Sequence, residues 1–176
     1  AGRNAILPQS SHTGTSSLRF TPQQGRVSLA GLALPVREHP RSGEYRFVTF
    51  AWRKDGGGRI ALQFDHADES QDCHKQGRLH GYRFDAGDGA PVDGLALRTD
   101  GKAPQAWWTL TRDLWHDFGD FTVTGLTFIC PDGDAAQFDS VYLGQSPADF
   151  ANIVMVARDT ATQPSPIMAR QTKSRE

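Results

Sequence analysis

The chain has 176 residues, 38% of them hydrophobic, and a formal net charge of −1. This length and apolar content favour one domain with a single core. Because 19 basic residues balance 20 acidic ones, no electrostatic field attracts nucleic acid or an anionic membrane surface, and we expect neither as a partner. No apolar run approaches the roughly 20 residues of a transmembrane helix, so we expect no membrane insertion.

Short segments of alternating apolar and polar residues recur between 18 glycines and 10 prolines. This pattern predicts an all-β protein, specifically a two-sheet antiparallel β-sandwich of jelly-roll type with about eight to ten strands. In the clearest strand, RIALQFDH at 59–66, Ile60, Leu62 and Phe64 should face the core and the alternate residues solvent. Further strands are expected at 16–20, 25–32, 44–53, 80–87, 94–99, 106–111, 121–129 and 135–144.

Turn chemistry suggests how some of these strands are joined. KDGGGR, at 54–59, predicts a tight turn that makes residues 44–66 a β-hairpin. A change in the parity of apolar residues at Asp139 and Ser140 predicts a β-bulge. Ser146 followed by proline is a helix N-cap pattern and predicts a short helical turn near 147–152.

The domain organisation follows from these elements. We expect a loose N-terminal segment at 1–14, in which NAILP could pair as an edge strand, and a β-sandwich domain at 15–152. Residues 153–176 are polar towards their end, contain proline and lack periodicity, which is typical of a linker or of a tail that orders against a partner.

The stretch WWTLTRDLWHDFGDF, residues 107–121, is dense in chemically active side chains. Thr111 or Asp113 as N-cap and Gly119 as a left-handed exit predict a single helical turn at 113–118. Leu114 and Phe118 should then share its buried face.

The polar residues of this stretch fit the same interpretation. Arg112 should pair with Asp113 or Asp117, while His116 and Asp117 should point to solvent or bond neighbouring backbone. The stretch is therefore better explained as a corner between two strands than as a catalytic centre.

Potential metal ligands concentrate between residues 65 and 80, but their spacing matches no known zinc pattern, and we interpret the segment as a long polar loop. Acidic loops at 85–94 and 132–134 are compatible with a structural calcium ion, although their Asp-Gly pairs are ordinary turn chemistry. We therefore expect no cofactor and commit to no metal site. The weak candidates for metal ligands are His66, Asp68, His74 and His80.

The two cysteines, Cys73 and Cys130, lie in no metal-binding or redox motif. They either form one disulfide that closes a loop of about 57 residues or remain one buried thiol and one loop thiol.

The sequence also lacks the motifs of common enzymes. There is no GxSxG nucleophile elbow, and the three glycines at 56–58 have neither the frame nor the following helix of a phosphate loop. A carboxylate pair for glycoside hydrolysis cannot be recognised without spatial separations. We therefore expect a non-catalytic protein.

Three blocks carry a family resemblance: EHPRSGEYRFVTFAWRKDGGGRIALQF, WWTLTRDLWHDFGDFTVTGLTF and GDAAQFDSVYLGQSPADF. They resemble a poorly characterised family of extracytoplasmic bacterial modules found in multidomain secreted proteins, often with c-type haem domains. That family in turn resembles the galactose-binding-like jelly rolls, which include many carbohydrate-binding modules. The Cys- and His-rich loop at 72–80 departs from the family pattern.

The resemblance implies a periplasmic or secreted binding module that holds carbohydrate by stacking sugars on exposed aromatic rings. Trp107 and Trp108 must face opposite sides of their strand, and Trp108 shares the parity of the apolar Leu110. Trp107 is therefore the first candidate ligand contact. Trp115 and Arg112 are further candidates, although both tryptophans could instead lie under loops.

We rank three functions. The first is a non-catalytic extracytoplasmic binding module, with carbohydrate as its partner. The second is a structural or assembly subunit that docks onto a partner protein domain or a larger complex, which could contain haem. The third is a carbohydrate-active enzyme.

Overall fold

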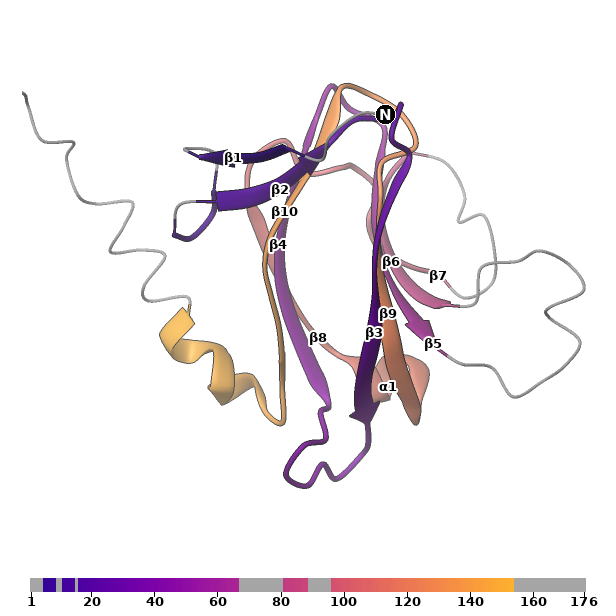
Figure 1. The fold of residues 1–176 in the computed structure, drawn as a ribbon, viewed down its shortest axis with the longest axis vertical. Coiled ribbons are helices and arrows are strands. Elements are labelled where there is room, and N and C mark those ends of the chain that lie inside the picture. The colour runs from indigo at the N-terminus through magenta and orange to yellow at the C-terminus, as the bar shows by residue number, and fades with distance from the viewer. Residues whose placement is uncertain (1–4, 9–10, 15, 67–80, 89–95, 154–176) are drawn as a thin grey trace, which may run out of the picture.

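The computed structural model describes residues 5–8, 11–14, 16–66, 81–88 and 96–153. Their strands form two facing sheets (Figure 1). Sheet A contains, in spatial order, β1 (Ala5–Pro8), β2 (Ser16–Phe20), β10 (Ala135–Gly144), β4 (Phe47–Asp55) and β8 (Trp108–Asp113). Sheet B contains β3 (Arg26–Val36), β9 (Phe121–Ile129), β5 (Arg59–His66), β6 (Gly81–Gly87) and β7 (Ala96–Asp100).

This arrangement confirms the predicted all-β sandwich. Among the described residues, the α-helix α1 (Leu114–Phe118) follows β8, and the 3-10 helix η2 (Pro147–Phe150) follows β10 and continues as helix over 151–153. One strand pair departs from the expected antiparallel pattern, because β7 pairs in parallel with β6. None of the helices in the described part of the chain has the length and apolar character needed to cross a membrane.

Aromatic rings from both sheets fill the core between the layers. Trp52 of β4 is fully buried and lies edge-on to Phe50, with 5.0 Å between the ring centroids. Phe50 in turn stacks across the sandwich on Phe84 of β6 at 6.0 Å. Such ring pairs contribute about 0.5–1.5 kcal/mol each beyond the burial of their area. The core therefore joins sheets A and B through aromatic contacts.

The predicted hairpin at 44–66 is wrong. β4 belongs to sheet A and β5 to sheet B, so residues 56–58 form an arch that carries the chain from one sheet to the other. All three glycines of this arch have positive φ, at 77°, 73° and 78°. Both strands have a strongly apolar face, and these faces meet across the core, which hairpin pairing within one sheet would prevent. Turn composition alone did not distinguish the two connections.

A lysine lies buried beside the arch. Lys54, at the end of β4, is fully buried, and its Nζ donates hydrogen bonds to the carbonyl oxygens of Asp132 at 2.6 Å and Asp55 at 3.2 Å. Gly133 has a φ of +68°, and a Cβ at this position would collide with Lys54 Nζ and lie 2.6 Å from the carbonyl oxygen of Gly57. The loop before β10 therefore needs glycine in order to close over the lysine.

The local predictions at β10 are confirmed. Its register with β4 shifts between Asp139 and Tyr142, and Ser140 adopts a φ of 54°, which together form the bulge. Ser146 then forms a capping box with Asp149 at the start of η2. Hydrogen bonds from the Ser146 and Gln145 amides lower the pKa of Asp149.

The outer face of β5 was expected to be open to solvent, and this expectation is wrong for part of it. Ala61 and Gln63 point away from the core but are only 3% and 1% exposed. Gln63 Nε2 donates to Asp65 Oδ1 at 2.6 Å, and Thr127 Oγ1 of β9 donates to Asp65 Oδ2 at 2.8 Å. Strand alternation predicted which way these residues face, but alternation carries no information on what covers a face.

Candidate functional site

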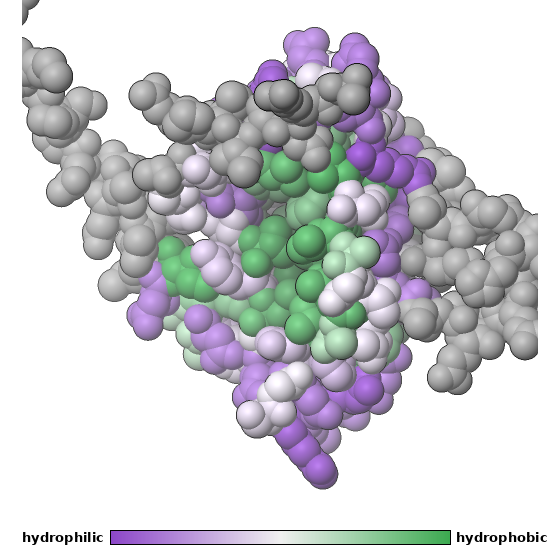
Figure 2. Space-filling model, in the orientation of Figure 1, coloured by the Kyte–Doolittle hydropathy of each residue, from purple (hydrophilic) through white to green (hydrophobic). Residues whose placement is uncertain are grey.

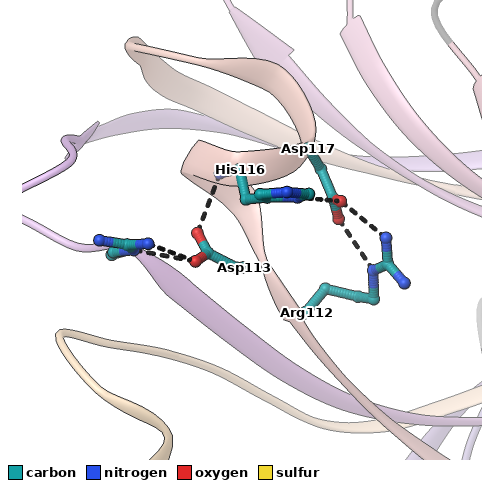
Figure 3. A network of polar contacts seen from close by, with 5 residues as sticks. Arg112, Asp113, His116 and Asp117 are labelled. Carbon is teal, nitrogen blue, oxygen red and sulfur yellow. Dashed lines mark hydrogen bonds and ion pairs between the residues drawn. The ribbon is translucent and has the colours of Figure 1, made fainter.

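The corner after β8 is organised by two ion pairs (Figure 3). Asp113 caps α1, because one carboxylate oxygen accepts a hydrogen bond from the backbone amide of His116 at 3.0 Å. The other oxygen accepts from Arg46 Nε at 2.9 Å and Nη2 at 2.7 Å. Burial by itself would raise the pKa of Asp113, but the hydrogen bonds from Arg46 and His116 outweigh it and lower that pKa.

The second ion pair joins Arg112 to Asp117. Arg112 donates from Nε at 2.8 Å and from Nη2 at 2.6 Å, a two-pronged contact with a carboxylate that is only 5% exposed. The guanidinium also lies 5.6 Å from the ring centroid of Phe84 in sheet B. The predicted pairing of Arg112 with Asp113 or Asp117 is therefore confirmed for Asp117. The Asp117 side chain is buried in this pair, rather than pointing to solvent or bonding neighbouring backbone as predicted, whereas His116 is exposed. This ion pair joins α1 to β8 at the edge of sheet A.

The prediction of a helical turn with Asp113 as its N-cap and Gly119 as its exit is confirmed. Gly119 has a φ of 79°, and its amide donates to the carbonyl oxygen of Trp115 at 2.7 Å. Leu114 is fully buried and Phe118 packs against the core, as expected for the inner face of this turn. Most of the stretch that resembles an active site in the sequence therefore has an evident structural role.

The structure separates the three candidate ligand contacts. Trp115 lies on α1, packs against the core and has Arg46 over its ring at 5.2 Å. Arg112 is near the end of β8, whereas Trp107 immediately precedes that strand. Five residues of extended chain separate Trp107 from Arg112 by about 16 Å, and the two have opposite parity. The candidates therefore do not converge on one site.

Trp107 is the candidate that lies on the outer side of sheet A. Its ring centroid is 5.9 Å from that of His12, whose Nε2 lies 3.1 Å from the Thr109 hydroxyl on the outer face. The next residue, Trp108, faces the core and lies 6.2 Å from Trp52, as the parity argument predicted. Trp107 is half-buried and is not one of the side chains that pack on the described core.

Residues 11–14 pass over the outer face of sheet A beside this tryptophan. The backbone amides of His12 and Thr13 both donate to Asp139 Oδ2, at 2.7 and 3.0 Å. Thr49 and Ala51 on the same face of β4 are buried. The segment at 11–14 thus forms one border of the surface around Trp107.

On that surface, four residues form what we call the outer row: Arg19, Gln137, Arg53 and Trp107. Gln137 of β10 is paired with Arg19 of β2 on one side and with Arg53 of β4 on the other. The ladder of β4 and β8 ends at the pair Trp52 and Trp108, so Arg53 and Trp107 are the next residues of the two segments. The chain before Trp107 leaves this register, because the Lys54 amide donates to the carbonyl oxygen of Pro104. With strands about 4.8 Å apart, the outer row extends roughly 14 Å across the sheet.

Asp55 holds two of the three polar members of the outer row, Arg53 and Gln137. Arg53 donates to Asp55 Oδ1 from Nε at 3.2 Å and from Nη2 at 3.0 Å. Gln137 donates to Asp55 Oδ2 at 2.9 Å. Arg53 has 31% of its side chain exposed, and Arg19 is half-buried. Gln137 is only 1% exposed, so the groups that the row presents to solvent are Trp107, Arg53 and Arg19, of which Asp55 holds Arg53.

Trp107 could be identified from the sequence, but the rest of the outer row could not. Its four members come from segments up to 118 positions apart in the chain, and only the strand order brings them together. A second missed feature is a charged group on the outer face of sheet B, where Asp85 accepts hydrogen bonds from Arg59 at 2.9 Å and Arg83 at 3.1 Å. The only sign of this group in the sequence was that polar residues alternate with apolar ones along β5 and β6.

Most candidate metal ligands, namely Asp68, His74 and His80, lie outside the described residues. His66 is described and stacks on Tyr82, with 4.6 Å between the ring centroids. Within the described ranges, no group of three His, Cys, Asp or Glu side chains is placed to hold a metal ion. In the acidic loop at 132–134, Asp132 Oδ1 accepts a hydrogen bond from the Arg59 amide at 2.7 Å, which joins this loop to the start of β5.

Cys130 is a buried free thiol that donates to the carbonyl oxygen of Asp132 at 3.5 Å. Burial raises the pKa of this thiol and so favours its protonated form. Cys73 lies outside the described residues, so the disulfide between these cysteines stays a prediction.

Comparisons with known proteins do not assign this site. No protein-family model matches the chain, and no curated protein matches it significantly.

Proposed function

We propose that this protein is a non-catalytic extracytoplasmic binding module for carbohydrate, of galactose-binding-like jelly-roll type, and that it binds sugar along the outer row of sheet A. The observation that carries this proposal is the half-buried Trp107 on the outer side of sheet A, at the end of the paired residues Arg19, Gln137 and Arg53. Sugar rings have an apolar face that packs on an aromatic ring, and their hydroxyl groups bond to arginine and amide side chains.

The geometry supports an extended ligand more than a single small one. The row crosses β2, β10 and β4 and ends at Trp107, just before β8, and the Asp55 carboxylate holds two of its polar side chains. Groups that are already held in place lose little conformational entropy when a ligand binds. A chain of sugars lying across the strands would contact Trp107 at one end and Arg19 at the other.

The test is calorimetric titration of the full chain with a panel of neutral and acidic polysaccharides, together with its Trp107→Ala variant. We expect binding by the native protein and a loss of affinity of about tenfold or more in the variant, because a central aromatic contact commonly dominates such interfaces. Trp115→Phe, which changes a ring on α1 outside the outer row, is the matched control and should bind normally. Absence of binding across the panel, or equal binding by Trp107→Ala, would refute the proposal.

A second candidate function is a structural or assembly role. It is favoured by two large apolar side chains that are exposed on sheet edges, Leu29 at 52% and Tyr142 at 43%. If this role is the correct one, the Leu29→Ser variant should lose a protein partner while keeping any polysaccharide affinity. The two proposals therefore predict opposite sensitivities for the Trp107 and Leu29 variants.

A further inference from the structure

The sandwich is open along one side, between β10 of sheet A and β3 of sheet B. Figure 2 shows apolar surface in the middle of this view, between the two layers. Leu29 on β3 is exposed, and the apolar side chains that line this opening are only partly buried. The partly buried members are Leu32, Leu34, Val141 and Leu143. Tyr142 on β10 is also exposed, but it pairs with Thr49 and lies on the outer face of sheet A.

The edge of β10 is paired along only part of its length. β2 pairs with Ala136–Phe138, and residues 11–14 bind the bulge at Asp139 and Ser140. Beyond the bulge, β10 pairs with β4 on one side, and no described strand pairs with its other side. The open edge is therefore residues 141–144.

The direction of the backbone groups at this edge follows from one hydrogen bond. The carbonyl oxygen of Gly144 accepts from the amide of Arg46, just before β4, so the polar groups of Gly144 point towards β4. Because backbone groups of successive residues in a strand point in opposite directions, those of Leu143 point to the open edge. A neighbouring strand could bond to Leu143 and cover the apolar seam at the same time.

The chain itself brings a suitable segment to this place. The ring of Phe150 lies against Gly144, the last residue of β10, so the polypeptide is beside the open edge when it leaves η2. The residues after Ile153 read VMVA, which are uncharged, apolar and partly β-branched. Four extended residues span about 13 Å, which matches the four residues of the open edge.

We propose that residues 154–157 add to the open edge of β10 as an antiparallel strand and complete sheet A over the apolar seam. The tether favours this occupant over a second copy of the protein. Only three residues separate Phe150 from Val154, and a segment on so short a tether has an effective concentration on the order of millimolar at its site. A second molecule in dilute solution cannot match this concentration.

The experiment is amide hydrogen exchange on the full chain and on two proline variants, Val154→Pro and Met155→Pro. Proline removes an amide donor, and alternate amides of a strand point to opposite sides, so one of the two substitutions must disrupt pairing with β10. In that variant we expect exchange of the Leu143 amide to accelerate about tenfold, as for loss of one protein hydrogen bond. Binding of a dye specific for exposed apolar surface should increase in parallel.

Thr160→Pro, beyond the apolar segment, is the matched control and should leave the Leu143 amide unchanged. The amide of Leu62 in β5 serves as an internal reference, since unchanged exchange there shows that the variants remain folded. Unchanged Leu143 exchange in both proline variants would overturn the proposal. Protection of Leu143 that rises with protein concentration would also overturn it, because it would identify a second copy as the occupant.

Discussion

The basic side chains at the two ends of the sandwich, the corner after β8 and the arch after β4, donate to different kinds of acceptor. At the corner, Arg46 meets the carboxylate of Asp113, whose pKa it lowers. At the arch, Lys54 is fully buried, and its ammonium donates to the carbonyl oxygens of Asp132 and Asp55. A carboxylate loses its charge in acid, whereas a carbonyl oxygen accepts at every pH but must be positioned by the backbone. The corner should therefore be sensitive to pH, and the arch to chain geometry.

The largest expected effect is at the buried lysine. Lys54→Ala removes three methylene groups and the amine from the core and leaves the carbonyl oxygens without their donor, so we expect a loss of about 3 kcal/mol in the free energy of unfolding. Urea denaturation followed by tryptophan fluorescence measures this loss. The exposed Lys102→Ala is the control and should change stability by less than about 0.5 kcal/mol. A small effect at Lys54 would mean that its burial contributes little to the arch.

A smaller loss of stability should follow from adding a side chain at Gly133, which lies against Lys54. Gly133→Ala combines positive φ with a clash against Lys54 Nζ, while Gly14→Ala has a similar φ, +64°, and open space around it. We expect a cost of about 2 kcal/mol at Gly133 and about 1 kcal/mol at Gly14, because backbone strain is common to both. The same denaturation assay applies. Equal costs at the two glycines would show that strain alone, and not the lysine, requires glycine in this loop.

The smallest expected effect is the pH dependence of the corner. Because the folded-state pKa of Asp113 is lowered, its contribution to stability is complete above the ordinary aspartate pKa of about 3.9 and is lost as pH falls through the folded-state value. Asp113→Asn should remove about 1 kcal/mol or less at pH 7, and this loss should shrink as the pH falls below the ordinary aspartate pKa. Thermal denaturation of both proteins between pH 7 and pH 2 measures this difference. A difference that does not shrink over this range would assign the effect to the helix cap rather than to the ion pair.

Local features were predictable from the sequence because their causes lie within a few residues. Asp113 and Gly119 mark the ends of a helical turn by their capping chemistry, and the parity change at Asp139 marks a bulge. Parity likewise separated Trp107 from Trp108. These predictions depend on one strand or one turn and need no knowledge of its neighbours.

The remaining features depend on which strands become neighbours. The glycines at 56–58 permit a hairpin or an arch, and only the pairing of β4 with β8 and β10 decides between them. The outer row depends on the same pairing. Lys54 resembles a surface residue in the sequence, and its burial results from the loop at 130–134 closing over it. Part of the candidate site was therefore predictable by residue type, but its assembly was not.

The arch at 56–58 also constrains the order in which the protein can form. Because consecutive strands β4 and β5 lie in different sheets, β4 has no neighbour in the chain to pair with as it is synthesised. The strands that pair with β4 begin at Trp108 and Ala135, so the centre of sheet A can form only after the second half of the polypeptide has been synthesised. Long-range pairing of this kind slows folding, because the entropy of closing a large loop is lost before the stabilising contacts form. While only the N-terminal half has emerged from the ribosome, the apolar face of β4 stays exposed, because β8 and β10 have not yet been synthesised.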